Sequence, residues 1–142
     1  MYYDFDSNTK TASVVAGVDT GNIVIPSTVK YEGEEYNVTE IGDGAFYGCR
    51  SLTSITIPSS LTTIGWSAFE ECTSLTSITI PEGVTSIENS AFYYCISLTS
   101  ITIPESVTEI GDAAFKYCSS LTSITIPESV TEIGDDAFYY CI

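Results

Sequence analysis

The sequence predicts a solenoid of stacked repeats, and three observations support this fold class. The five cysteines of the chain recur at one constant interval, at Cys49, Cys72, Cys95, Cys118 and Cys141. Phenylalanine, isoleucine, leucine and proline keep the same interval. Residues 96–118 and 119–141 differ at only three of 23 positions. One such unit is too small to bury its own apolar face, whereas units stacked about 4.8 Å apart bury a continuous column.

The first half of each repeat predicts a short β-strand. In residues 98–103, β-branched and hydroxylated residues favour a strand that directs Ile101 and Ile103 into the core. Pro104 has no N–H to donate, so we expect it to end the strand. Stacked strands would place these isoleucines in the shared apolar column.

The second half of each repeat predicts a turn and a short helix. Gly111 and Asp112 form a turn signal, and Asp112 is a residue type that accepts hydrogen bonds from the free amides at a helix start. Residues 114–118 then predict a helix of about one turn. Phe115 and Cys118 are expected on its buried face because they are three residues apart.

Residues 1–40 depart from the repeat, and we predict an N-terminal β-hairpin cap that includes a degenerate first repeat. The match to the repeat begins at residues 23–26, and it resumes at residues 39–41 after an insertion of nine residues. The inserted segment 31–36 and the polar segment 6–9 each indicate a hairpin turn between β-prone arms. Terminal repeats must cover the open end of an apolar column. Residues 41–142 then hold the 23-residue repeats, one partial and four full, in a single structural domain.

The composition excludes several classes of function. The chain has 142 residues, 44% of them hydrophobic, and a mean hydropathy of +0.20, which is enough to bury a core. Four basic and nineteen acidic residues give a net charge of −15, which argues against nucleic acid and anionic membranes as partners. No segment has the roughly 20 apolar residues of a membrane helix, so no membrane insertion is expected. The N-terminus has no basic region followed by an apolar one, so no signal peptide is predicted in this chain.

Catalysis is also disfavoured. The chain contains no histidine, which excludes Ser–His and Cys–His nucleophile pairs. Glycosidase chemistry needs two carboxyl groups across a cleft in different environments, and here the acids form uniform rows. We therefore predict that the protein is not an enzyme and that it uses no cofactor.

The repeat pattern resembles that of a known family. The order Leu, Ile, Ile-Pro, Val or Leu, Ile, Ala-Phe, Cys is seen whole in residues 52–72, 75–95, 98–118 and 121–141. It resembles the BspA-like (Treponema pallidum-type) leucine-rich repeats over roughly residues 23–142, and the first segment looks like the start of some Bacteroides members. The resemblance implies a right-handed leucine-rich-repeat solenoid with a parallel β-sheet on one face, and we expect the one-turn helices on the other. It also implies an extracellular or cell-surface protein that binds host or neighbouring-cell proteins.

The stacked cysteines and carboxylates are candidates for disulfides or metal sites. An odd number of cysteines leaves at least one thiol unpaired, and side chains that run parallel suit disulfide and metal geometry poorly. We expect a buried, reduced cysteine ladder that acts as a column of small hydrophobic side chains. Aligned carboxylates repel one another, and a calcium ion would relieve the repulsion. The only metal site considered is a weak surface calcium site, with candidate residues Glu105, Glu128, Asp112 and Asp135.

Two surfaces offer candidate contacts for a partner. Tyrosines gather late in the repeats beside acidic residues, and this combination suits a protein interface. The alternative is that the tyrosines only fill grooves between adjacent repeats. The strand face presents threonines beside serines, which suits a contact surface, an ice-binding surface or an ordinary solvated strand. The candidate contact residues are Tyr93, Tyr94, Tyr117, Tyr139, Tyr140, the single tryptophan Trp66, and Thr56, Thr79, Thr102 and Thr125.

The main hypothesis is a non-catalytic cell-surface or secreted module that binds proteins, as an adhesin does. A face that looks the same in every repeat favours a repetitive partner through avidity. The alternative hypothesis is a structural spacer or assembly element that forms a homodimer through an uncapped C-terminal end.

Overall fold

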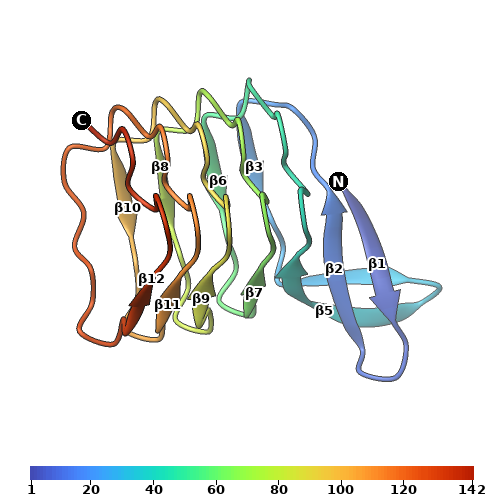
Figure 1. Cartoon of the computed structure of the whole chain (residues 1–142). Helices are drawn as coiled ribbons and strands as arrows, with labels where there is room; N and C mark the ends of the chain where they lie inside the picture. The colour runs from blue at the N-terminus through green and yellow to red at the C-terminus, as the bar shows by residue number, and fades with distance from the viewer.

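The structure, a computed structural model, describes residues 1–142 and contains twelve short β-strands (Figure 1). The N-terminal part holds an antiparallel hairpin, a first short strand of the solenoid and a second hairpin. In the later part each coil has two strands, except that the last coil has only β12, and the coils follow one another along a single axis (Figure 1). The strands are β1 (Tyr2–Asp6), β2 (Thr11–Ala16), β3 (Asn22–Val24), β4 (Thr28–Tyr31), β5 (Glu34–Ile41), β6 (Ser54–Thr56), β7 (Thr63–Ile64), β8 (Ser77–Thr79), β9 (Ser86–Ile87), β10 (Ser100–Thr102), β11 (Glu109–Ile110) and β12 (Glu132–Ile133).

The repeats form a parallel β-solenoid of about five turns, which confirms the predicted stacked solenoid with a parallel sheet. One ladder has the strand order β10-β8-β6-β3, and its identical residues lie opposite each other, as Ile78 and Ile101 do. A second ladder, β12-β11-β9, runs beside the first along the solenoid, and β7 pairs with β5 (Figure 1). Sequence patterning missed this second strand because it is only two residues long and too short to show a period of two.

The predicted one-turn helices are wrong, because the structure contains no helix and residues 112–117 form consecutive turns. In an α-helix every amide donates to the carbonyl four residues earlier. Here alternate amides donate to the next coil instead. Phe92 N donates to Ala114 O of that coil at 2.9 Å, whereas Tyr93 N donates to Ser90 O of its own turn at 3.0 Å. Half of the amides that a helix would use internally therefore join adjacent coils.

Left-handed residues explain why the turn cannot become a helix. The first coil places Gly44 (φ 61°) and Gly48 (φ 68°) at two left-handed positions. Later coils place non-glycine residues there, with φ between 53° and 64°: Ser67, Glu71, Ser90, Tyr94, Ala113, Tyr117, Asp136 and Tyr140. An L-residue in this region costs about 1–2 kcal/mol, and an α-helix requires consecutive right-handed residues.

The predicted helix-capping role of Asp112 is also wrong. Its Oδ1 accepts the backbone N–H of Asp135, in the next coil, at 2.8 Å. Asp43 and Asn89 accept a backbone N–H from the following coil in the same way, also at 2.8 Å. These side chains therefore stabilise the stacking of coils rather than the start of a helix.

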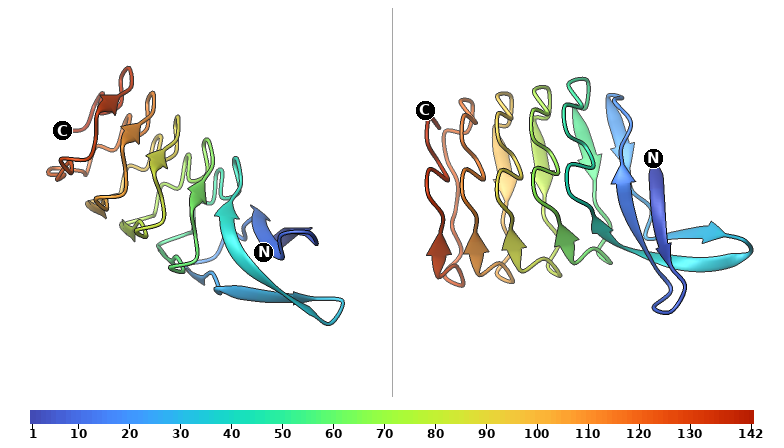
Figure 2. Two further views of the ribbon diagram at one scale, coloured as in Figure 1. Left: turned by 90° about the horizontal axis from the view of Figure 1, so that it is seen from below. Right: turned by 45° about the vertical axis from the view of Figure 1, so that its right-hand side comes forward.

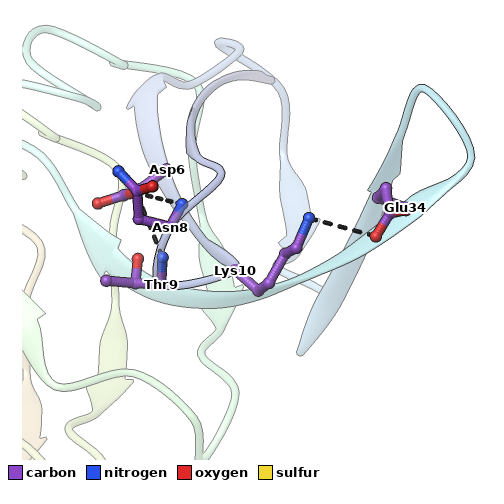
Figure 3. Close-up of polar contacts among 5 residues, drawn as sticks. All are labelled: Asp6, Asn8, Thr9, Lys10 and Glu34. Carbon is purple, nitrogen blue, oxygen red and sulfur yellow. Dashed lines mark hydrogen bonds and ion pairs between the residues drawn. The ribbon is translucent and has the colours of Figure 1, made fainter.

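Both hairpins predicted near the N-terminus are present. The strands β1 and β2 pair antiparallel, as do β4 and β5, and the β4–β5 hairpin projects away from the coils (Figure 2). Asp6 orders the first hairpin turn, since its carboxylate accepts Asn8 N–H at 2.8 Å and Thr9 N–H at 3.3 Å (Figure 3). These bonds, that from Asn8 above all, lower the pKa of Asp6. Lys10 and Glu34 form an ion pair at 3.2 Å between the two hairpins. That this segment caps the solenoid stays a prediction.

One continuous apolar column fills the solenoid. Phe115 and Cys118 are fully buried, as predicted, although they lie on a turn and not on a helix. Ile103 is buried and Ile101 is partly buried. Five phenylalanine rings, Phe46, Phe69, Phe92, Phe115 and Phe138, stack with centroids 5.3 to 5.4 Å apart and planes within 8° of parallel. Identical side chains thus bury one another, coil by coil.

The cysteines form the expected ladder, and all five are free thiols. Four of them are buried, and Cys141 is partly exposed. The structure adds a contact that the sequence did not reveal, because each thiol after Cys49 donates to a phenylalanine carbonyl of the preceding coil. The bonds run from Cys72 to Phe46, from Cys95 to Phe69 and from Cys118 to Phe92 at 3.1 Å, and from Cys141 to Phe115 at 3.0 Å.

Burial of the cysteine ladder predicts a loss of stability in alkaline solution. Desolvation raises the pKa of Cys72 and of Cys118 from 9.0 to about 12, and it raises the pKa of Cys95 as well. Below pH 9 these thiols are protonated in both states, so their contribution to stability is fully present. Between pH 9 and pH 12 the unfolded chain releases protons that the folded chain retains. The free energy of unfolding should fall by about 1.4 kcal/mol per pH unit for each such thiol.

Urea unfolding followed at about pH 8 and about pH 10.5 measures this slope. The matched comparison is the double variant Cys72→Ala, Cys118→Ala, whose slope should be smaller by the contribution of two thiols. Tyrosine and lysine ionisation affects both proteins equally. Identical slopes for the two proteins would contradict the prediction.

Candidate functional site

Five tyrosines form a continuous cluster on the turn side of the last coils. We call Tyr93, Tyr94, Tyr117, Tyr139 and Tyr140 the tyrosine cluster. Tyr117 is its centre and contacts the other four rings at centroid distances of 5.5 to 6.0 Å. Tyr139 and Tyr140 pack edge to face at 4.6 Å. The structure thus brings together every tyrosine that the sequence singled out as a candidate contact.

The cluster is exposed, and three of its residues have a left-handed backbone. Tyr94, Tyr139 and Tyr140 are 43%, 47% and 52% exposed, so the rings do more than fill grooves between coils. Tyr94, Tyr117 and Tyr140 have φ of 60°, 64° and 58°, at the position where the first coil has Gly48. Glu71 has the same conformation in another coil, so this backbone belongs to the repeat and only the choice of tyrosine is particular to the cluster.

A lysine of the chain lies against the cluster. Lys116 Nζ is 4.8 Å from the centroid of the Tyr139 ring and 5.7 Å from that of Tyr117. The same ammonium donates to Asp136 Oδ2 at 2.7 Å, and this bond raises the pKa of Lys116. Sequence reasoning missed this group. The signal was available, because Lys116 and Asp136 account for two of the three differences between residues 96–118 and 119–141.

The predicted threonine contacts lie along the first ladder, and we call the surface that they form with the neighbouring serines the hydroxyl face. Thr56, Thr79 and Thr102 are exposed at the ends of β6, β8 and β10, and Thr125 is exposed outside any strand. Thr56 and Thr79 line a hollow of about 490 Å³ over β6 and β8, together with Ser54, Ser77, Ser59 and Glu82 among others. The lining also includes three isoleucines and Pro81, so the hollow offers hydroxyl groups, one carboxylate and apolar side chains, but no aromatic ring.

Trp66 is the remaining candidate contact residue, and its coil departs from the repeat. It is 58% exposed, and its Nε1 donates to Glu88 Oε2 at 2.8 Å. The other four coils have Asp or Asn in place of Trp66 and glycine in place of Glu88. A Cβ on Gly111 would lie 2.7 Å from Asn89 N, so glycine is needed where an Asx side chain bonds to the next coil. The two departures from the repeat therefore occur together.

The carboxylates considered for calcium do not converge. Glu105, Glu128, Asp112 and Asp135 are all exposed. No group of three or more acidic, histidine or cysteine side chains is placed to hold a metal ion. Asp112 instead uses Oδ1 to accept a backbone N–H of the next coil.

Taken together, a parallel β-solenoid with exposed aromatic and hydroxyl rows defines a repeat protein of the leucine-rich type. Such repeats generally serve as protein-interaction modules and are typically non-catalytic. The chain belongs to the BspA type leucine-rich repeat family, whose model matches residues 17–142 in six copies. Members of this family are commonly associated with the cell surface.

Solved structures agree with this assignment. The leucine-rich repeat protein of T. pallidum shares 36% identity and a TM-score of 0.89, with 99% of this chain and 64% of that chain covered. A leucine-rich repeat protein from Bacteroides ovatus shares 41% identity and a TM-score of 0.92, with 99% and 37% covered. A leucine rich cell surface protein from Faecalibacterium prausnitzii shares 31% identity and a TM-score of 0.59, with 98% and 50% covered. The chain thus spans less than two thirds of the length of these proteins.

No curated protein is similar to the chain in sequence. The structure has no helix with the length and apolar character needed to cross a membrane.

The pairing of Trp66 with Glu88 predicts energetic coupling between two coils. Trp66→Asp alone should destabilise the fold by about 1 kcal/mol, because the new carboxylate meets the Glu88 side chain. Adding Glu88→Gly restores the arrangement of the other coils and should recover most of that loss. Urea unfolding of the two single variants and the double variant measures the coupling. Trp66→Asp combined with Glu128→Gly, an exposed site in another coil, is the control and should be additive; additive effects for Trp66 and Glu88 would show that the two are independent.

Proposed function

We propose that the chain is a non-catalytic module of a cell-surface or secreted protein and that it binds another protein through the tyrosine cluster. The observation that carries the proposal is the cluster itself: five adjoining rings, of which Tyr94, Tyr139 and Tyr140 are well exposed. Tyrosine is enriched at protein interfaces because its ring buries a large area at low entropic cost while its hydroxyl stays solvated. The partner is a protein of a host or of a neighbouring cell, as in an adhesin.

The hydroxyl face is the second surface in this proposal. Its threonines recur once in each repeat, from Thr56 to Thr125, so a partner with its own repeat would meet several equivalent contacts. The hollow over β6 and β8 combines hydroxyl groups and Glu82 with the apolar side chains of isoleucines and Pro81, which suits a segment with both polar and apolar side chains. The tyrosine cluster would supply most of the affinity, because aromatic side chains dominate binding energy at interfaces.

Replacement of the left-handed tyrosines by glycine should separate binding from folding. The variant Tyr94→Gly, Tyr117→Gly, Tyr140→Gly removes three rings at positions where Gly48 already serves in the first coil. Lost aromatic packing and relieved backbone strain offset each other, so the free energy of unfolding should change by only about 1 kcal/mol. Affinity for a protein or peptide partner should fall by about tenfold or more.

A random peptide library displayed on phage and selected against the immobilised chain provides the ligands for this test. Biosensor measurements then compare the wild type, the glycine variant and Tyr47→Leu, an exposed tyrosine outside the cluster. Selected peptides that bind the glycine variant as tightly as the wild type would show that the cluster is not the binding site.

Self-association through the end formed by the last coil is the alternative function, and one apolar side chain there favours it. Ile133 is 52% exposed. If a second copy covers this end, light scattering over a concentration series should detect a dimer. The folded variant Ile133→Lys, Phe138→Glu should be monomeric; a wild type that stays monomeric throughout contradicts the alternative.

A further inference from the structure

We infer that the tyrosine cluster is a receptor for basic side chains, so that the partner presents a segment rich in lysine or arginine. This inference rests on the proposed function and names the chemistry of the partner. It follows from how the chain holds its own cations, from its charge balance and from the rings that remain available.

The Lys116 ammonium is an internal example of the proposed ligand. It lies 4.8 Å from the Tyr139 ring centroid and 5.7 Å from that of Tyr117, and it is paired with Asp136. Lys10 repeats the arrangement elsewhere, 5.3 Å from the Tyr36 ring centroid and in an ion pair with Glu34. A tyrosine face beside a carboxylate is therefore the setting in which this chain places an ammonium group.

The charge balance shows that the chain has too few basic side chains to pair with its acidic ones. Of its four basic side chains, three are already in ion pairs: Lys10 with Glu34, Arg50 with Glu71 and Lys116 with Asp136. The nineteen acidic side chains include those three partners, which leaves sixteen without an ion pair. The net charge of −15 attracts a cationic segment and repels an acidic one. A second copy of this chain would bring the same charge and is a poor occupant.

Two rings of the cluster remain open to an incoming cation. Tyr94 and Tyr140 are 43% and 52% exposed, and no lysine or arginine of the chain lies over either ring. Both adjoin Tyr117, at centroid distances of 6.0 and 5.5 Å. Basic side chains of one extended segment can therefore reach rings on both sides of Lys116, with Tyr117 between them.

Removal of the internal ammonium tests the inference. The probes are a peptide of alternating arginine and glycine and the same peptide with glutamine in place of arginine. Lys116→Met vacates the site between Tyr117 and Tyr139, so the arginine peptide should bind about three-fold more tightly than to the wild type. Lys30→Met changes the net charge equally at an exposed residue of β4 that is in no ion pair, and it should have little effect. Equal effects of the two substitutions would mean that only overall charge matters, and the inference would be wrong.

The glycine variant of Tyr94, Tyr117 and Tyr140 provides the second test. It keeps every charge, so loss of arginine-peptide binding by about five-fold or more, with the fold intact by circular dichroism, supports the inference. Undiminished binding at moderate salt overturns it. The glutamine peptide should bind weakly to all variants, and tight binding of that peptide to the wild type would also overturn it.

The phage-selected peptides distinguish failure of this inference from failure of the proposed function. Selected sequences rich in lysine and arginine that require the cluster support both. Selected sequences that require the cluster but carry no excess of basic residues overturn the inference and leave the proposed function standing. Sequences that are indifferent to the cluster overturn both.

Discussion

The rest of the structure depends on one constraint: each residue lies beside the residue at the equivalent position of the neighbouring coil. The phenylalanine stack shows the benefit, since rings 5.3 to 5.4 Å apart bury one another in a column that no single coil could form. The backbone follows the same constraint. Alternate amides of the turn donate to the next coil, and the cysteine thiols donate back to the preceding one. Residues with a left-handed backbone are tolerated despite their conformational cost, because the hydrogen bonds between coils require that conformation.

A row of identical residues stacks well when it is apolar and poorly when it is charged. Glu109 lies opposite Glu132 in the second ladder, where like charges repel. Complementary pairs therefore arise only where neighbouring coils differ. The ion pairs of Arg50 with Glu71 and of Lys116 with Asp136, and the hydrogen bond of Trp66 with Glu88, all join residues 20 to 22 apart. Departures from the repeat thus create the distinctive chemistry of the surface, and the tyrosine cluster is built around one of them.

The division of roles between core and surface suits an interaction module. The apolar column provides stability through repetition, whereas the turn side can vary because its backbone bonds do not depend on the side chain. Gly48, Glu71 and Tyr94 occupy equivalent left-handed positions and illustrate this freedom. Repeat proteins use such variable positions for recognition. Here variation has gathered five tyrosines and one lysine on a protein of net charge −15.

The sequence by itself determined the solenoid, its family, the buried faces of Phe115 and Cys118, and both N-terminal hairpins, because periodicity and turn chemistry are local properties. It also singled out the tyrosines. Only the tertiary structure decided that residues 112–117 are turns and not helices, that Asp112 bonds to the next coil, and that a second ladder exists. The same holds for Lys116 over the tyrosine rings. Each of these features depends on hydrogen bonds or contacts between residues of neighbouring coils, and a pattern read within one coil does not contain them.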